Sequence, residues 1–518
     1  MQATNHLEIT CPPCAVDALP PELLWKIFMI NTEREDLDEW STGPWYVDDP
    51  DGRLDTARSC SQVCRLWRTL LLQFSSVWGR LLHIADFEHV ADAWREVIIE
   101  RIGDALLWVT GKITNSTRPF IMPILEKKWT NVQILVVEDE GLYESEVLLA
   151  WSFLKREAPQ LEVITLWADE CNNRADPRHI LPFSPIFNNF APRLKVFGLE
   201  TSYLLSQPAP WLSNLYYITF PREQSTHLIL SALKSMPLLR HLNISRNTVQ
   251  HMVHVNDGNL DKPHLPLLEH FWIDGGDPVT ICLLLESITL PPGQNALQTL
   301  RLPTFHEMSQ EGSQARERLH HAITKWIHSY MASFASPRLT LIDSEQVLSL
   351  IDVPQTEHEG MQVELPYSDN HSHFTIQSIA NCPRLSFVED LTVYLSSSPH
   401  WPLQPLYEAL QSITYLTVGG PGMGTLFHDM QQFSLFPHLD TIEIFSTVDG
   451  TINDDRSGEE SVIPTIIHFL EHRASIGRPL FMLDLSSLNI DGVSHTNLER
   501  LINISCLLLK LPGDDWDD

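Results

Sequence analysis

The chain has 518 residues, 43% of them hydrophobic, and its 66 acidic and 35 basic residues give a formal net charge of −31. Binding to nucleic acid or to an anionic membrane surface requires clustered Lys and Arg, and the sequence contains no such cluster. We therefore expect neither partner. A chain of this length can form several globular domains or one elongated repeat array.

The sequence shows no sign of export or membrane insertion. Its first ten residues lack the basic start and the apolar segment of a secretory signal. No stretch approaches the roughly 20 apolar residues that cross a bilayer. The eight cysteines are scattered, which does not suggest a disulfide framework and suits a reducing compartment. We expect a protein of the cytoplasm, the nucleus or both.

The first predicted element is a helix within residues 17–30, which read DALPPELLWKIFMI. The Pro-Pro pair presets the start of a helix. After this pair, apolar residues recur with the spacing of one helical face, at Leu23, Leu24, Ile27, Phe28 and Ile30. Residues 1–16, which precede the helix, are expected to be disordered.

A polar, acidic stretch from about residue 31 to residue 55 contains Gly and Pro and predicts an inserted loop. A second helical pattern runs over residues 56–84. Its apolar residues recur at spacings of three and four, at Cys60, Val63, Cys64, Trp67, Leu70, Leu71 and Phe74. The same segment predicts a basic face within an acidic chain, formed by Arg58, Arg65, Arg68 and Arg80.

Residues 17–84 contain three short motifs in a fixed order. A Leu-Pro-x-Glu-x-Leu-x-x-Ile-Phe string comes first, then Val-Cys-Arg-x-Trp, then a Trp about ten residues later. The matching residues are Leu19, Pro20, Glu22, Leu24, Ile27, Phe28, Val63, Cys64, Arg65, Trp67 and Trp78. This order resembles the F-box, and most closely the divergent F-box-like domains of fungal proteins. The inserted loop departs from the family pattern, although such an insertion costs little free energy.

The resemblance implies an all-helical domain that binds a Skp-family adaptor, which in turn bridges to a cullin scaffold. A domain this small leaves much apolar surface uncovered, and a partner is the natural place for that surface. The resemblance assigns ten residues jointly to the small core and the adaptor interface: Leu19, Pro20, Leu23, Ile27, Phe28, Val63, Cys64, Trp67, Leu70 and Trp78. The alternative is an ordinary helical cap on the rest of the chain.

From about residue 100 an apolar-x-x-apolar-x-apolar pattern recurs. Its first positions step by between 21 residues (194 to 215) and 33 residues (161 to 194), which straddles the period of leucine-rich repeats, roughly 20–29 residues. Clear copies are Val132–Leu135–Val137, Leu161–Ile164–Leu166, Leu194–Phe197–Leu199, Leu215–Ile218–Phe220, Leu239–Leu242–Ile244, Leu268–Phe271–Ile273, Leu297–Leu300–Leu302, Val388–Leu391–Val393, Ile413–Leu416–Val418, Leu439–Ile442–Ile444 and Leu480–Leu483–Leu485. Weaker candidates are Leu107–Val109, Leu339–Leu341 and Val363–Leu365.

Helix-like stretches lie between the copies, at residues 227–235, 279–288, 313–335, 403–413 and 464–473. The predicted fold class is therefore α/β: the helical F-box is followed by an irregular leucine-rich-repeat-like solenoid over residues 85–511, with a parallel concave sheet. Segments near 303–335 and 446–463 should protrude, and residues 512–518 should form an acidic tail. A compact α/β domain is the alternative.

Several motifs could carry chemistry, and each has a simpler interpretation. The string His468-Phe-Leu-Glu471-His472 matches an H-x-x-E-H metalloprotease motif but has no evident third ligand, so we expect an exposed helical face. The glycine-rich residues 419–424 lack phosphate-loop spacing and indicate a tight corner. Cys11 and Cys14 have C-x-x-C spacing without a second pair.

The sequence therefore predicts a non-catalytic adaptor subunit of a Skp–cullin–F-box ubiquitin ligase. Its F-box would bind the Skp-family adaptor, and its repeat region would bind an unknown protein substrate. We expect no catalytic residue, metal or cofactor. Two alternatives are a protein-binding scaffold that works outside any ligase and an enzyme built around His468 and His472.

Overall fold

The computed structural model describes residues 19–32, 52–140, 151–168, 185–199, 209–220, 225–244, 262–273, 278–289, 299–301, 313–333, 337–344, 347–352, 362–366, 372–396, 401–445, 462–487, 500–501 and 508–510. The chain divides into two compact units, Met1–Gln224 (unit 1) and Ser225–Asp518 (unit 2). The predicted disordered N-terminus, the acidic tail, Cys11 and Cys14 lie outside the described residues.

Unit 1 begins with four short helices, α1 (Pro21–Ile30), α2 (Arg53–Val63), α3 (Arg65–Gln73) and α4 (Ser75–Arg80). The single helical pattern predicted over residues 56–84 is thus interrupted twice. Cys64 is extended, with φ −154° and ψ 172°, and its Sγ accepts a hydrogen bond from the backbone N–H of Trp67 at 3.4 Å, which caps α3. Phe74 separates α3 from α4. Helix α2 starts two residues before the predicted loop end at residue 55, because Leu54 is part of the core.

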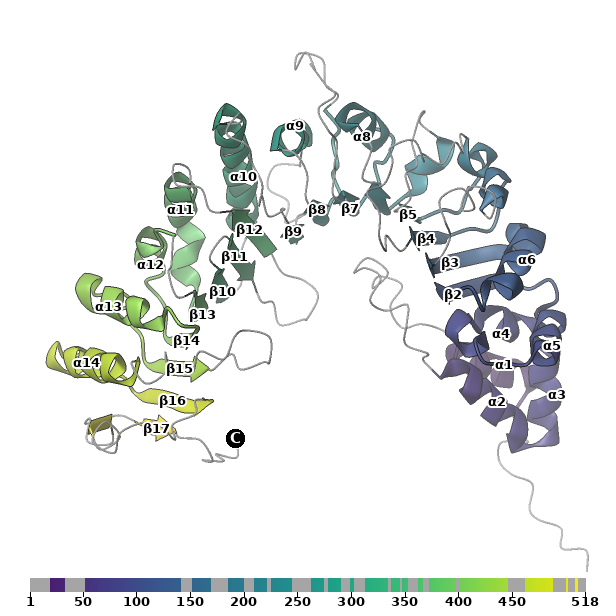
Figure 1. Ribbon diagram of the computed structural model, residues 1–518, viewed down its shortest axis with the longest axis horizontal. Coiled ribbons are helices and arrows are strands. Elements are labelled where there is room, and N and C mark those ends of the chain that lie inside the picture. The colour runs from purple at the N-terminus through teal and green to yellow at the C-terminus, as the bar shows by residue number, and fades with distance from the viewer. Residues whose placement is uncertain are drawn as a thin grey trace, which may run out of the picture. The chain divides into compact units, whose positions relative to one another are not determined.

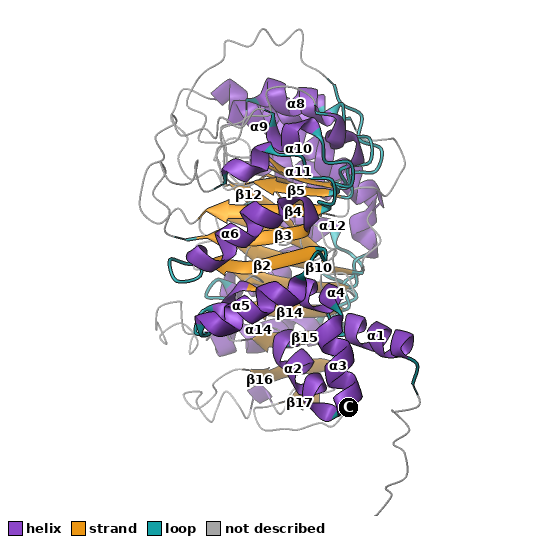
Figure 2. Ribbon diagram, turned by 90° about the vertical axis from the view of Figure 1, so that its right-hand side faces the viewer, coloured by secondary structure: helices purple, strands orange, loops and turns teal. Residues whose placement is uncertain are grey.

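The first strand of a parallel sheet follows these helices closely in the sequence. Strand β1 (Leu82–His83) comes directly after α4 and pairs in parallel with β2, so the predicted boundary at residue 84 lies inside unit 1. The remaining strands of unit 1 are β2 (Leu107–Ile113), β3 (Val132–Asp139), β4 (Val163–Ala168), β5 (Val196–Leu199) and β6 (Tyr217–Phe220), and its longer helices are α5 (Asp92–Ile102) and α6 (Arg118–Lys128). Each strand pairs in parallel with the next. Figure 2 shows α6 lying across the face of this sheet.

Unit 2 continues the alternation of strand and helix. Its first elements are α8 (Thr226–Leu233), β7 (His241–Ile244), β8 (His270–Ile273), α9 (Pro278–Ser287), β9 (Thr299–Arg301) and α10 (Ser313–Ser333). Strands β7, β8 and β9 are parallel. Helix α10 buries one apolar stripe, formed by Leu319, Ala322, Ile323, Trp326 and Ile327. The Trp326 indole donates to the Leu285 carbonyl at 2.8 Å, so this helix packs against α9 and does not protrude.

An eight-stranded sheet forms the rest of unit 2. Its strand order is β12 (Gln362–Pro366), β11 (Val347–Asp352), β10 (Arg338–Asp343), β13 (Asp390–Leu395), β14 (Tyr415–Gly419), β15 (Thr441–Phe445), β16 (Met482–Ser487) and β17 (Leu508–Lys510). Helices α11 (Ser372–Ala380), α12 (Gln404–Ala409), α13 (Met423–Phe433) and α14 (Val462–Ser475) lie along one side of these strands (Figure 1).

The apolar pattern read from the sequence coincides with these strands. The middle positions of successive copies are direct register neighbours, as for Leu391, Leu416 and Ile442. In unit 1, Leu135, Ile164 and their successors align in the same way. These side chains are fully buried, because parallel strands covered by helices need a continuous apolar row. The prediction of a mixed α/β fold with parallel strands is confirmed.

One weak copy was assigned wrongly. Strand β12, which contains Val363 and Leu365, pairs antiparallel with β11, and β11 pairs antiparallel with β10. An apolar-x-apolar alternation is the same in parallel and antiparallel strands, so it does not set strand direction. Among the described residues, no helix combines the length and the apolar character required to cross a bilayer.

Candidate protein-docking surface

Helix α1 carries apolar side chains on two sides. Leu24, Phe28 and Met29 are buried in the core of the helical region. Leu23 and Ile27, one turn apart, are 45% and 39% exposed. Ile30, one further turn along the same side, is 65% exposed. A surface helix normally turns a polar face to water, so this second apolar side needs an explanation.

Two aromatic contacts fix α1 in place. The rings of Phe28 and Trp67 meet edge to face, with centroids 5.1 Å apart and an interplanar angle of 77°, which joins α1 to α3. The Trp25 indole donates to the Ser76 hydroxyl at 3.1 Å, which joins α1 to α4. Figure 2 shows α1, α2, α3 and α4 gathered at one end of the sheet of unit 1. The exposed side of α1 is therefore held by a packed core.

The turn between α2 and α3 also carries exposed apolar side chains. Val63 is 62% exposed, and Leu66 at the start of α3 is also exposed. Cys64 between them is half-buried and has a free thiol. Cys60, one helical turn earlier, is half-buried too, and burial raises the pKa of its thiol. Both cysteines therefore act as small packing residues, as their places in the sequence pattern indicate.

The predicted basic face is only partly formed. Arg58, Arg65 and Arg68 are exposed on α2 and α3, and Arg58 pairs with Asp55 at 3.2 Å. Arg80 lies elsewhere, because its guanidinium stacks 4.2 Å from the ring centre of Trp108 in strand β2. Its assignment to one basic face was wrong, because the breaks at Cys64 and Phe74 rotate α4 away from α2.

Trp78 is a core residue at the junction between the helices and the sheet. It is 1% exposed, and its indole donates to the Leu71 carbonyl at 2.7 Å. The guanidinium of Arg101 in α5 lies 4.6 Å from its ring centre. The backbone of α4 also packs closely against residue 106 at this junction. A Cβ on Gly79 would lie 2.3 Å from the Leu106 carbonyl oxygen. Trp78 therefore joins α4 to α5 and β2 and has no free surface for a partner.

The ten residues predicted from the sequence separate into three groups by burial. Phe28, Leu70 and Trp78 are buried. Leu19, Cys64 and Trp67 are half-buried. Pro20, Leu23, Ile27 and Val63 are exposed. The docking surface is defined here by the last group together with Ile30 and Leu66.

Trp25, Ile30 and Leu66 were not among the ten predicted residues, although all three are exposed. Ile30 continues the spacing of Leu23 and Ile27, so helical periodicity could have included it. Leu66 could not have been found in that way, because its exposure depends on the extended residue at Cys64.

The other sequence motifs form no catalytic arrangement among the described residues. On α14, His468 and Glu471 are exposed, as expected, whereas His472 is half-buried; Ile467 and Leu470 are buried. Glu471 pairs with Arg500 at 2.6 Å and not with either histidine.

The glycine-rich segment is the corner between β14 and α13. Gly420 has φ +89°, and a Cβ there would lie 2.2 Å from the Leu395 carbonyl oxygen. The Gly422 amide donates to that same oxygen at 3.2 Å. The segment is thus used for close backbone packing, which fits the corner interpretation.

No family model matches this chain, and no curated protein matches it. The docking surface is therefore interpreted from its residues and geometry alone.

Proposed function

We propose that this chain is the substrate-recognition subunit of a Skp–cullin–F-box ubiquitin ligase, with α1–α4 as an F-box-like domain. The exposed apolar side of α1 is the observation that carries the proposal. Leu23, Ile27 and Ile30 lie on a helix whose opposite side packs through Phe28 and Trp67. These are also the elements on which the F-box motifs stand.

The energetics favour a protein partner for this surface. Burying a Leu or Ile side chain that is roughly half exposed contributes about 1 kcal/mol. Five exposed side chains of this kind, Leu23, Ile27, Ile30, Val63 and Leu66, could form the apolar centre of an interface. Exposed apolar residues gathered on adjacent helical segments are typical of an interaction site, whereas isolated ones are common on any surface. The partner that we propose is a Skp-family adaptor, and through it a cullin scaffold.

The strands that follow are proposed to form a leucine-rich-repeat-like solenoid that holds the target protein. In β13, β14 and β15 every second side chain is buried against the helices and the intervening ones are half-exposed. Their half-exposed residues include Asp390 and Glu443, and Tyr415 donates to Glu443 at 2.7 Å. Together with the net charge of −31, this acidic character favours a basic patch on the target.

The proposed subunit makes and breaks no covalent bond. It would bring a target lysine close to a ubiquitin carrier and so raise its effective concentration. Such a subunit would work in the cytoplasm, the nucleus or both.

Co-purification of the tagged full-length chain with a Skp-family adaptor tests this proposal. Ile27→Asp places a charge in the apolar surface and should abolish recovery of adaptor and cullin while the melting temperature stays unchanged. Trp67→Ala removes the ring that supports Phe28 and should weaken the complex as well, as should Leu19→Asp at the start of the motif.

Phe374→Asp is the matched control, because Phe374 is an exposed apolar residue on helix α11 of unit 2. It should leave the complex intact. Equal recovery of the adaptor with wild type and with Ile27→Asp would show that α1 is not the interface. A chain that recovers the adaptor but no cullin would be a scaffold that works outside a ligase.

A further inference from the structure

A cluster of two histidines and one glutamate lies on strands β7 and β8. His241 and His270 are direct register neighbours on these parallel strands. Both stand one residue before the middle apolar position of their repeat copy, Leu242 and Phe271. Because Leu242 and Phe271 are buried against the helices, the two histidines are on the other face of the strands.

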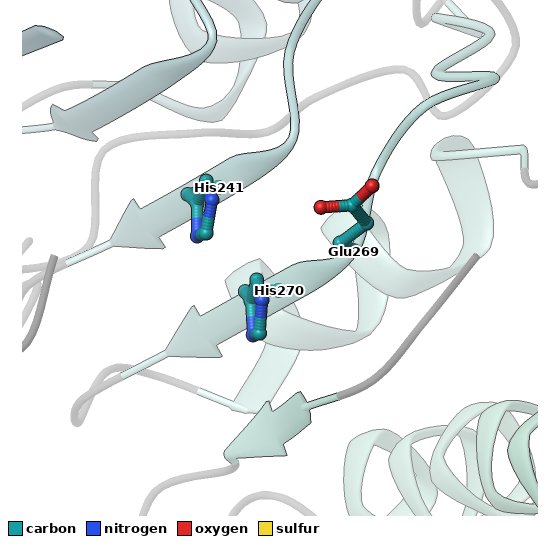
Figure 3. A group of neighbouring side chains, drawn as sticks. All are labelled: His241, Glu269 and His270. Carbon is teal, nitrogen blue, oxygen red and sulfur yellow. The ribbon is translucent and has the colours of Figure 1, made fainter. Parts of the chain in front are cut away.

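The three side chains bring their ligand atoms together. Figure 3 shows the two imidazole rings one above the other, with the carboxylate of Glu269 beside them. The ring centres are 4.4 Å apart and the ring planes differ by 7°. One nitrogen from each histidine and one carboxylate oxygen lie within 4.8 Å of one another, and all three residues are half-buried.

We propose that His241, His270 and Glu269 bind one Zn²⁺ ion, with a further coordination position left for water or for a side chain of a bound protein. Two imidazole nitrogens and one carboxylate oxygen form a donor set that suits zinc, whereas calcium and magnesium prefer oxygen ligands alone. Nothing in the adaptor function requires this site, so the two proposals stand independently.

The surroundings of the two histidines disfavour positive charge on either ring. Burial, together with the neighbouring His270 ring and Arg240, lowers the pKa of His241 to about 3. Burial lowers the pKa of His270 to about 4.

Binding requires both imidazole rings to rotate. In a tetrahedral zinc site the bonds of about 2.0–2.1 Å place two nitrogens roughly 3.4 Å apart, with both lone pairs directed at the ion. The lone pairs of parallel rings do not converge, so each imidazole must turn about its Cβ–Cγ bond. That torsion has broad energy minima, which permits the rotation.

Arg240 modulates the site. Its guanidinium pairs with Glu269 at 3.2 Å, and this pair is partly exposed to solvent. The pairing holds the carboxylate next to His241, but the positive charge opposes a bound cation. Replacing Arg240 with a neutral residue should therefore strengthen zinc binding. If the stacked histidines served only to pack the two strands together, neither wild type nor this variant would bind zinc.

Calorimetric titration of the metal-stripped full-length protein with zinc chloride tests the proposal. Wild type should bind one Zn²⁺ at this cluster. His270→Ala should weaken zinc binding by about a hundredfold or more. Loss of a residue that only supports a metal ligand already weakens metal affinity by about 10- to 100-fold. Arg240→Gln should tighten zinc binding. Circular dichroism should show that each variant remains folded.

His468→Ala is the matched control. His468 is an exposed histidine on α14, one helical turn from His472, and this pair could bind zinc adventitiously. This variant should keep the zinc site of wild type. With Co²⁺ in place of zinc, the visible absorption bands should be lost in His241→Ala and kept in His468→Ala. Zinc affinity that is the same in His270→Ala as in wild type, or no binding by wild type, would overturn the proposal.

Discussion

The stability of unit 2 should depend on pH through one buried carboxyl group. Asp343, at the end of strand β10, is fully buried, and neither of its carboxylate oxygens has a hydrogen-bond partner among the described residues. Burial raises its pKa from 3.8 to about 7. The buried Tyr407 lies close enough that the Asp343 charge contributes to raising the pKa of the phenol. An ionised Asp343 would therefore be poorly stabilised in the folded chain.

The sign and size of the effect follow from this shift. Between pH 4 and pH 7 the folded chain keeps the Asp343 proton and the unfolded chain loses it, so the free energy of unfolding falls as pH rises. A difference of about three pKa units corresponds to about 4 kcal/mol, fully lost above pH 7. The stabilisation is complete below pH 4, where both states are protonated.

Asp343→Asn removes this titration, because an amide does not ionise. Urea unfolding of the full-length chain at pH 5 and pH 8 should show a smaller loss of stability in the variant than in wild type. Asp104→Asn, at a fully exposed aspartate, is the control and should behave as wild type does. Equal pH dependence in wild type and Asp343→Asn would refute the reasoning.

Two further predictions concern packing, and both are read as changes in melting temperature. Trp78→Ala should destabilise the chain by about 3–5 kcal/mol, because the cavity would open between the N-terminal helices and the sheet of unit 1; an unchanged melting temperature would show that Trp78 is not part of the core. Gly420→Ala should cost more than 1 kcal/mol, since the residue has φ +89° and a Cβ would meet the Leu395 carbonyl. Gly424→Ala is its matched control: nothing lies within 4 Å of a Cβ there, so it should stabilise helix α13 by about 0.5–1 kcal/mol.

The repeated strands could be predicted from the sequence because their buried positions are occupied by regularly spaced apolar residues. Leu391, Leu416 and Ile442 stand at the same place in successive copies and are register neighbours in the sheet. The direction of β11 and β12 could not be predicted in the same way. Their apolar alternation matches that of a parallel strand, so pairing is decided by the connecting turn and not by periodicity.

The docking surface could be located from the sequence but not divided into core and surface. Leu23, Leu24, Ile27 and Phe28 together cover more than one side of a helix, so spacing alone does not say which of them faces inward. That choice is made by α3, because the ring of Trp67 packs on Phe28 and leaves Ile27 in solvent. Contacts between separate helices are not encoded in the period of either one.

The histidine cluster was missed although a signal existed. His241 and His270 are 29 residues apart, but each occupies the third position of its repeat copy. Equal positions in adjacent copies become register neighbours once the strands pair, so aligning the copies would have brought the two residues together. Glu269 carried no comparable signal, because it lies just before the strand.

The affinity of the purified full-length chain for a purified Skp-family adaptor tests the central claim most directly. Isothermal titration calorimetry should give a 1:1 complex with a dissociation constant of about 1 μM or below. Leu23→Asp should weaken the complex at least tenfold without changing the melting temperature. A wild-type chain that shows no heat of binding, or a variant that binds as tightly as wild type, would contradict the account.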